Sequence, residues 1–166
     1  NDPSKAAKQI SLTDLGSIKV SKEETKKMAA TIPRSSILGF IIGVLPGAGA
    51  TIASFLAYGM ERNFVKSEEK EKFGKGSVQG LSAPETANNA ACSGSFVPLL
   101  TLGIPGSGTT AVMLGALLGF GIQPGPRLYE TNPDIFWSVI MSMYIGMVVL
   151  LILNLPLIPY LSLIHI

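Results

Sequence analysis

The sequence predicts an all-helical membrane protein that enters the bilayer several times. Its 166 residues are 47% hydrophobic and only 14% charged, whereas about a quarter of the residues of a typical soluble domain are charged. Three long stretches are almost free of charge: residues 35–60 have none, residues 76–126 have only Glu85, and residues 135–166 have none unless His165 is protonated. Because a membrane-spanning helix needs about 20 apolar residues, each stretch is long enough to be embedded.

Composition also excludes several classes of protein. The net charge of +2 is small, and no basic cluster is interleaved with aromatic residues, which argues against nucleic acid as a partner. Cys92 is the chain's single cysteine, so neither an internal disulfide nor a multi-cysteine metal site is expected. The first residues include neither an initiator methionine nor an apolar leader. We therefore expect the chain to begin inside a longer protein.

Residues 1–34 are predicted to form a polar loop followed by a short basic helix. The spacing of Ser21 and Glu24 is typical of a capping box at a helix N-terminus. Pro33 is expected to end this helix at the membrane boundary. The segment holds seven Lys or Arg against four Asp or Glu, which favours the cytoplasmic side of the membrane.

Residues 35–160 are predicted to be the membrane-embedded region. Residues 35–60 would be about 39 Å long as one helix, which exceeds the hydrocarbon core of about 30 Å. The sequence Pro-Gly-Ala-Gly at residues 46–49 interrupts them, so we expect two half-helices joined by an unwound segment. The charged residues 61–75 predict a solvated connector.

A second capping-box spacing, from Ser82 to Glu85, predicts a helix that begins at Ala83. This helix would gather polar side chains on one face, at i, i+3, i+4 and i+7: Glu85, Asn88, Asn89 and Cys92. An ionisable residue within a long charge-free stretch is by default a functional hypothesis. Glu85, Asn88 and Asn89 are therefore predicted to bind a coupling cation or proton. The alternatives are a helix cap for the glutamate, interhelical hydrogen bonds for the asparagines and simple packing for the cysteine.

The following segment repeats the interruption of the first. Residues 95–103 predict a short apolar half-helix, the sequence Ile-Pro-Gly-Ser-Gly breaks it, and residues 109–122 resume it. Gln-Pro-Gly-Pro at residues 123–126 predicts a turn. A further membrane span is expected from about residue 135.

Two short sequences form an internal repeat. LPGAGATIA at residues 45–53 and IPGSGTTAV at residues 104–112 share one Pro, two Gly and one Thr in the same order, each 59 positions apart. Apolar segments interrupted at corresponding positions indicate a transporter binding site, since irregular backbone at membrane depth persists only inside protein or along a wet cavity.

Each turn is followed by a half-helix whose free N–H groups would favour an anion, and the nearby hydroxyl and carbonyl oxygens could coordinate Na⁺. The residues predicted to bind substrate are Pro46, Gly47, Gly49, Thr51, Pro105, Gly106, Ser107, Gly108, Thr109 and Thr110.

Other interpretations of the repeat are weaker. One such motif alone would more often be an ordinary proline kink with glycine packing, but two matching motifs favour a functional joint. A phosphate-binding loop requires a lysine after the glycines, and no lysine follows Lys75. An intramembrane enzyme lacks support, because the chain has no Ser/His or paired-Asp arrangement.

The chain closely resembles the large membrane subunit of the tripartite tricarboxylate transporters, the TctA family. Three segments carry the resemblance: GVLPGAGATIASFLAYGMER, APETANNAACSGSFVPLLTLGIPGSGTTAVMLGALL and GIQPGP. It covers about residues 15–158 and identifies the chain as part of the C-terminal half of a longer protein. The region of residues 35–160 is thus expected to be a partial transporter domain.

The resemblance implies secondary active uptake of tricarboxylates or other carboxylates across the bacterial inner membrane, driven by Na⁺ or H⁺. The implied partners are a smaller membrane subunit and a periplasmic solute receptor, with no cofactor besides the coupling ion. The family's glycine-proline turns carry over onto Pro46, Gly47, Gly49, Pro105, Gly106 and Gly108, and its acidic-Asn-Asn signature onto Glu85, Asn88 and Asn89. Gln79 and Thr86 depart from the family pattern, which has Glu and Ala there, so the coupling ion stays open.

The C-terminus departs as well. Residues 161–166, LSLIHI, are what a common transposon-library sequencing adapter encodes in one frame, so we interpret them as read-through and assign His165 no role. The alternative function is a non-coupled channel for small anions, which would need neither a receptor nor an ion gradient.

Overall fold

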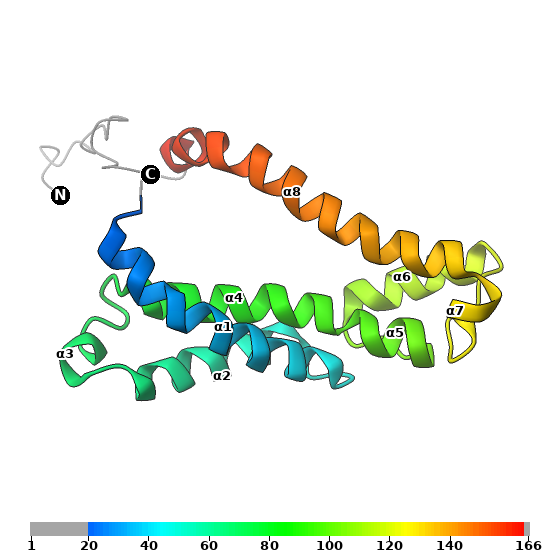
Figure 1. Cartoon of the computed structure of the whole chain (residues 1–166), viewed down its shortest axis with the longest axis horizontal. Helices are drawn as coiled ribbons and strands as arrows, with labels where there is room; N and C mark the ends of the chain where they lie inside the picture. The colour runs from blue at the N-terminus through cyan, green and yellow to red at the C-terminus, as the bar shows by residue number, and fades with distance from the viewer. Residues whose placement is uncertain (1–19, 165–166) are drawn as a thin grey trace, which may run out of the picture. The chain divides into compact units, whose positions relative to one another are not determined.

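The computed structural model describes residues 20–164, and within this range the protein is entirely helical. This confirms the all-helical prediction. The predicted polar loop lies, up to residue 19, outside the described residues, as do residues 165 and 166. The helices in Figure 1 are α1 (Lys22–Val44), α2 (Gly49–Phe64), α3 (Ser67–Lys70), α4 (Val78–Gly94), α5 (Phe96–Leu102), α6 (Gly108–Gly119), α7 (Leu128–Thr131) and α8 (Pro133–Ile164).

The described residues divide into two compact units: residues 21–136 form the first, and residues 137–164 belong to the second. Most of α8 belongs to the second unit. Its segment Pro133–Ile158 has 26 residues and a mean hydropathy of 2.4, and among the described residues it is the helix long and apolar enough to cross a membrane. This agrees with the span expected from about residue 135. Residues 161–164 continue the same helix.

Two predicted helix boundaries are wrong. Helix α1 does not end at Pro33 but continues through it to Val44, although an internal proline costs a helix about 3 kcal/mol. Helix α4 is capped by Ser77, whose Oγ accepts from the Gly80 N–H at 3.0 Å. It therefore begins five residues before the predicted start at Ala83, and Glu85 is not a helix cap. In both cases tertiary packing on each side of the proline offsets the lost backbone hydrogen bond.

That packing is a tight contact of α1, α2 and α4, which run side by side (Figure 1). The buried residues of all three helices recur every four positions and most are small. The residues at this spacing are Thr31, Ser35, Gly39 and Gly43 on α1, Ala53, Ala57 and Glu61 on α2, and Ala83, Ala87 and Ala91 on α4, to which α4 adds the buried Gly94 near its end. Helices with such a stripe approach until their backbones touch.

Glycine is required on α1 at the closest approach. A Cβ atom on Gly39 would collide with the carbonyl oxygen of Ala87, and one on Gly43 with that of Ala91. Because the contacting pairs advance together along both sequences, α1 and α4 are parallel. Helix α2 runs back along them, since its Glu61 contacts Gln79 while its Ser54 contacts Pro84 and Asn88.

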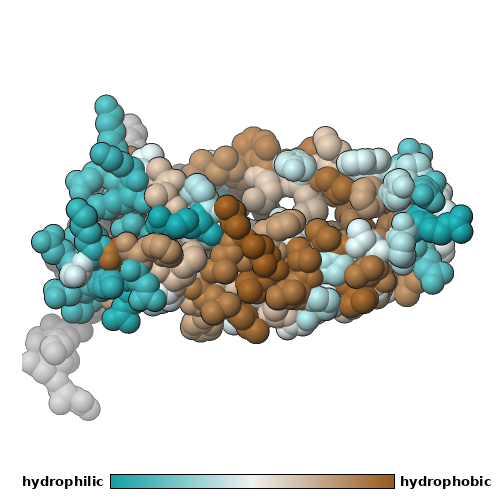
Figure 2. All heavy atoms as spheres, turned by 60° about the horizontal axis from the view of Figure 1, so that its bottom comes forward, coloured by the Kyte–Doolittle hydropathy of each residue, from teal (hydrophilic) through white to brown (hydrophobic). Residues whose placement is uncertain are grey.

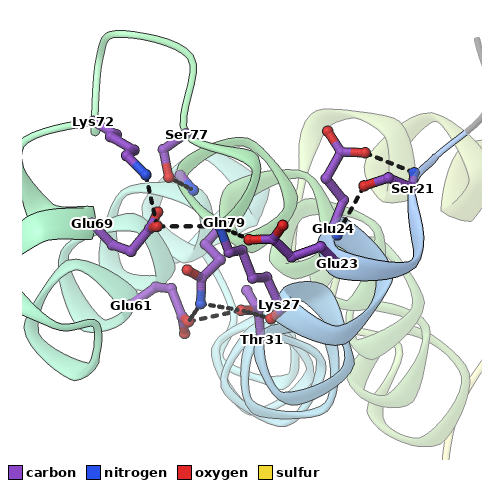
Figure 3. Close-up of polar contacts among 11 residues, drawn as sticks. Ser21, Glu23, Glu24, Lys27, Thr31, Glu61, Glu69, Lys72, Ser77 and Gln79 are labelled. Atoms are coloured by element: carbon purple, nitrogen blue, oxygen red, sulfur yellow. Dashed lines mark hydrogen bonds and ion pairs between the residues drawn. The ribbon is translucent and has the colours of Figure 1, made fainter. Parts of the chain in front are cut away.

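One charged cluster lies inside this bundle, and sequence analysis missed it. Residues 61–75 were predicted to be a solvated connector, but Glu61 belongs to α2 and is completely buried. Its Oε1 accepts from Thr31 Oγ1 at 2.7 Å, Arg34 Nη2 at 2.7 Å and Gln79 Nε2 at 3.2 Å. Arg34 Nε also donates to Oε2 at 3.3 Å. Figure 3 shows Thr31 and Gln79 converging on the carboxylate, and this set of donors is what a buried charge requires.

A second set of ion pairs holds α3 against α1 at the surface. Lys27 Nζ lies 3.2 Å from Glu69 Oε1, and Lys72 Nζ lies 2.8 Å from the same oxygen (Figure 3). Hydrogen bonds from Lys72 and Lys27 lower the pKa of Glu69, and those to Glu69 and Glu23 raise the pKa of Lys27. The charged end of α1 is thus joined to α3 and its flanking residues by complementary ion pairs.

The outer face of α1 and α2 is apolar. Figure 2 shows hydrophobic residues over the middle of this face and hydrophilic residues at the end that carries α3. Large exposed side chains there include Ile37, Phe40 and Ile41 on α1 and Ile52 and Phe55 on α2. Such an exposed apolar face suits contact with lipid or with further membrane helices.

Replacing Gly39 by alanine in the complete protein tests the close approach of α1 and α4. Since the added methyl group would meet backbone rather than a flexible side chain, we expect a loss of about 1–3 kcal/mol in the free energy of unfolding. This loss of stability is measured as a lower midpoint temperature of thermal unfolding in detergent. Gly59→Ala is the matched control, because no atom lies within 4 Å of its Cβ position. Equal midpoints for the two variants would contradict the packing.

Candidate functional site

The first break lies between α1 and α2, at the position predicted from the Pro-Gly-Ala-Gly sequence. The Leu45 N–H donates to Ile42 O at 3.1 Å, and the Ala48 N–H donates to Leu45 O at 3.2 Å. Gly47 and Gly49 have φ angles of 83° and 70°, a conformation that glycine adopts without strain. The break reverses the chain, so α1 and α2 form a hairpin with this turn at its tip.

The second break separates α5 from α6. Gly103 ends α5 with φ at 69°, its N–H donating to Leu99 O at 3.0 Å. Ser107 begins α6 through a capping box: its Oγ accepts from the Thr110 N–H at 3.2 Å, and its own N–H donates to Thr110 Oγ1 at 2.8 Å. The repeated sequence thus gives a helix break both times, but only the second turn has a side-chain cap.

The two turns face one cavity of about 690 Å³, a volume within the range of small-molecule sites. It is lined by Gly47, Gly49, Ala50, Thr51, Cys92, Ser95, Phe96, Pro105, Gly106, Ser107, Gly108, Thr109, Thr110 and Ala111. Every residue predicted to bind substrate is in this set except Pro46. Residues more than 50 positions apart in the sequence therefore line the same cavity.

The end of α1 and the junction of α4 with α5 bring the turns together. A Cβ atom on Gly106 would lie 3.3 Å from Ser95 Cβ and 3.6 Å from Gly43 O. Ser95 is held in place by its Oγ, which donates to Cys92 O at 2.7 Å. Because Gly43 also lies in the contact between α1 and α4, that contact positions the second turn as well as the first.

Among the described residues, the lining carries hydroxyl groups but no Lys, Arg, His, Asp or Glu side chain. The polar groups are hydroxyls and the backbone N–H groups of the first turns of α2 and α6, which lack acceptors inside their helices. Such N–H groups and the positive ends of helix dipoles favour an anion. The hydroxyl and carbonyl oxygens could in turn coordinate a hard cation such as Na⁺.

The predicted coupling residues lie on α4 but do not line this cavity. Glu85 and Asn89 are exposed on the side of α4 away from the buried alanines. Asn88 is half-buried, and its Nδ2 donates to Ser54 Oγ on α2 at 3.3 Å. Its Oδ1 accepts from Cys92 Sγ at 3.9 Å. Asn88 is therefore one helical turn from the cavity wall, whereas the structure does not bring Glu85 to it.

Sequence analysis missed five wall residues: Ala50, Cys92, Ser95, Phe96 and Ala111. The cysteine was interpreted as a packing residue, but it is exposed. The available signal was the helical spacing that places Cys92 one turn beyond Asn88 on the polar face of α4. Nothing in the sequence indicated that α4 would end beside the second turn.

These features define a class: a helical membrane protein with a hydroxyl-lined cavity between two helix breaks. A family comparison makes the class specific, because residues 1–165 match the model described as "Tripartite tricarboxylate transporter TctA family". The chain belongs to this family of polytopic transporter membrane components, which are not enzymes.

Two curated relatives come from Agrobacterium vitis. An uncharacterized 52.8 kDa protein in the TAR-I ttuC′ 3′ region is 48% identical over 139 residues, which cover 84% of this chain and 27% of that protein. An uncharacterized protein in the TAR-II ttuC′ 3′ region is 49% identical over 120 residues, which cover 72% of this chain and 49% of that protein. The chain thus spans less than half the length of each relative. No solved structure matches the chain.

Gly106→Val in the complete protein tests the contact between the second turn and the α1 end. The valine methyl groups would press on Ser95 and on the Gly43 carbonyl, moving the turn away from the cavity. We expect uptake of a labelled tricarboxylate to be abolished at unchanged protein abundance. Gly115→Val is the control, because nothing lies within 4 Å of its Cβ position on α6. Parental uptake by the Gly106 variant would show that the turn is not part of the site.

Proposed function

We propose that this chain forms part of the permease of a bacterial carrier that takes up tricarboxylates or related carboxylates. The observation that carries the proposal is the cavity shared by the two Pro-Gly turns. Substrate carboxylates would be held by the N–H groups at the starts of α2 and α6 and by the hydroxyls of Thr51 and Thr109. Pro46, outside the lining, would shape the first turn.

The length of the hairpin arms supports a site at membrane depth. The charge-free part of α1, residues 35–44, is about 15 Å long at the usual helical rise, which is half of the hydrocarbon core of about 30 Å. Charged residues flank this hairpin at one end, before residue 35 and after residue 60. We infer that α1 and α2 form a re-entrant hairpin whose tip reaches the middle of the bilayer, and that α5 and α6 form its counterpart.

The uncharged lining favours a cation-coupled carrier. A tricarboxylate brings several negative charges, yet no Lys or Arg is among the described residues that line the cavity. Burying such an anion without a balancing charge is costly, so a co-transported Na⁺ or H⁺ would lower the cost of loading. Glu85, with Asn88 and Asn89, is the proposed coupling site, because an exposed carboxylate on α4 needs a polar partner inside the membrane.

The tripartite nature of the family supports the remaining assignments. In the complete system we propose a smaller membrane subunit and a periplasmic solute receptor as partners, in the bacterial inner membrane. Receptor dependence and gradient dependence separate this carrier from a non-coupled anion channel. A channel would pass solute in both directions without a receptor and without an ion gradient.

Cys92 offers a direct test of the cavity as the substrate site. In a complete permease that retains Cys92 as its single cysteine, a small membrane-permeant thiol reagent should label it, since the thiol lies on the cavity wall. A bound tricarboxylate should slow the labelling about tenfold by occlusion. Moving the thiol to the neighbouring exposed position, with Cys92→Ser and Ser93→Cys, gives the control, because Ser93 does not line the cavity. Equal labelling with and without substrate would reject the site.

Glu85→Gln tests the coupling residue. Removing the charge while keeping the shape should abolish gradient-driven uptake, with expression intact, because the cation would lose its carboxylate. Uptake is measured in vesicles with imposed Na⁺ and H⁺ gradients. Glu68→Gln, which changes an exposed glutamate on α3, should behave like the parent. Normal uptake by the Glu85 variant would remove this residue from the coupling site.

A further inference from the structure

The contact between α1 and α4 follows one constant register. Thr31 meets Gln79 through a hydrogen bond of 3.4 Å, Gly39 meets Ala87, and Gly43 meets Ala91. The members of each pair are 48 positions apart. The same spacing pairs Ser35 with Ala83, and both are completely buried.

This contact does not by itself select its register. The stripe on α1 repeats every four residues with small side chains, and the stripe on α4 repeats every four residues with alanines. If α1 slid by one turn toward its charged end, Gly43 would face Ala87 and Gly39 would face Ala83. Gly43 would then take the place that Gly39 holds now, and Gly39 would take the place of the larger Ser35. No steric collision at these positions would therefore oppose the slide.

The buried charge cluster distinguishes the two registers. Glu61 on α2 accepts from Thr31 and Arg34 on α1 and from Gln79 on α4. A one-turn slide of about 6 Å would carry Thr31 and Arg34 out of reach of the carboxylate, and Glu61 would be left buried with an incomplete set of donors. Leaving a buried charge without its donors is strongly destabilising, so the cluster favours the observed register.

We propose that Glu61 is a positioning residue that specifies the register of α1 against α2 and α4. Specifying register is the best-attested role of buried polar groups. The register decides where the hairpin tip lies, because Gly47 and Gly49 are at the end of the same arm. A slide would withdraw this turn from the cavity and separate Gly43 from Gly106. The consequence for transport rests on the proposed function, whereas the register itself does not.

The register is tested in the complete protein, in a background without other cysteines, by an oxidative cross-link between Ser35→Cys and Ala83→Cys. The parental pair should cross-link, since these positions face each other. Adding Glu61→Gln should reduce the cross-linked fraction about tenfold, as the slipped register becomes populated. Glu69→Gln is the control, because it removes the Lys27 and Lys72 ion pairs at the surface and leaves the buried cluster intact. It should cross-link like the parent.

A kinetic readout separates positioning from simple stability. Without the cross-linking cysteines, Glu61→Gln should raise the KM for the carboxylate about tenfold while the maximal uptake rate per folded transporter changes little. If Glu61→Gln fails to accumulate, Thr31→Val takes its place. That variant removes the 2.7 Å donor but keeps the Arg34 pair, and it should show the same two changes at smaller size.

Each result bears on the proposal. The proposal would be overturned if Glu61→Gln cross-linked like the parent and had the parental KM. The same holds for Thr31→Val if Glu61→Gln does not accumulate. Failure of the parental cysteine pair to cross-link would also overturn the proposal. The cross-link forms without substrate, so it reports the register even if the protein carries no carboxylate. Lack of substrate protection at Cys92 in the parent would instead overturn the proposed function and leave the register result standing.

Discussion

The structure of residues 21–136 depends on the close backbone contact between α1 and α4. Gly39 and Gly43 allow this contact because no Cβ atom fits between them and the carbonyl groups of Ala87 and Ala91. Inside a membrane, helices gain little from the hydrophobic effect and associate through close packing and hydrogen bonds. The contact explains why α1 continues through Pro33, and it brings the C-terminal ends of both helices to the same place.

The cavity follows from that convergence. Helix α1 ends at the first Pro-Gly turn, and α4 ends beside the second, so two turns distant in sequence face one space. Their glycines supply a backbone that can turn sharply, and the helices that follow supply unpaired N–H groups.

Glu61 and Glu85 have opposite surroundings. Glu61 is surrounded by donors from two neighbouring helices, including a bidentate arginine, so its charge is matched and its position is determined. Glu85 is exposed on the outer side of α4. The rest of a longer protein is the natural source of its partner. The surroundings of Glu61 thus fix its position, whereas those of Glu85 leave its carboxylate accessible.

The sequence by itself determined the helical class, the membrane-length apolar segment, both helix breaks and the part of the cavity lining that the two turns supply. These features follow from local composition: apolar runs form helices, and Pro with Gly interrupts them. Only the tertiary structure decided where α1 ends and α4 begins, since packing outweighed the cost of Pro33 and Pro84. It also decided that Glu61 is buried and that Cys92, Ser95 and Phe96 reach the cavity. These outcomes depend on which helix faces meet, and a repeat of small residues is compatible with more than one such pairing.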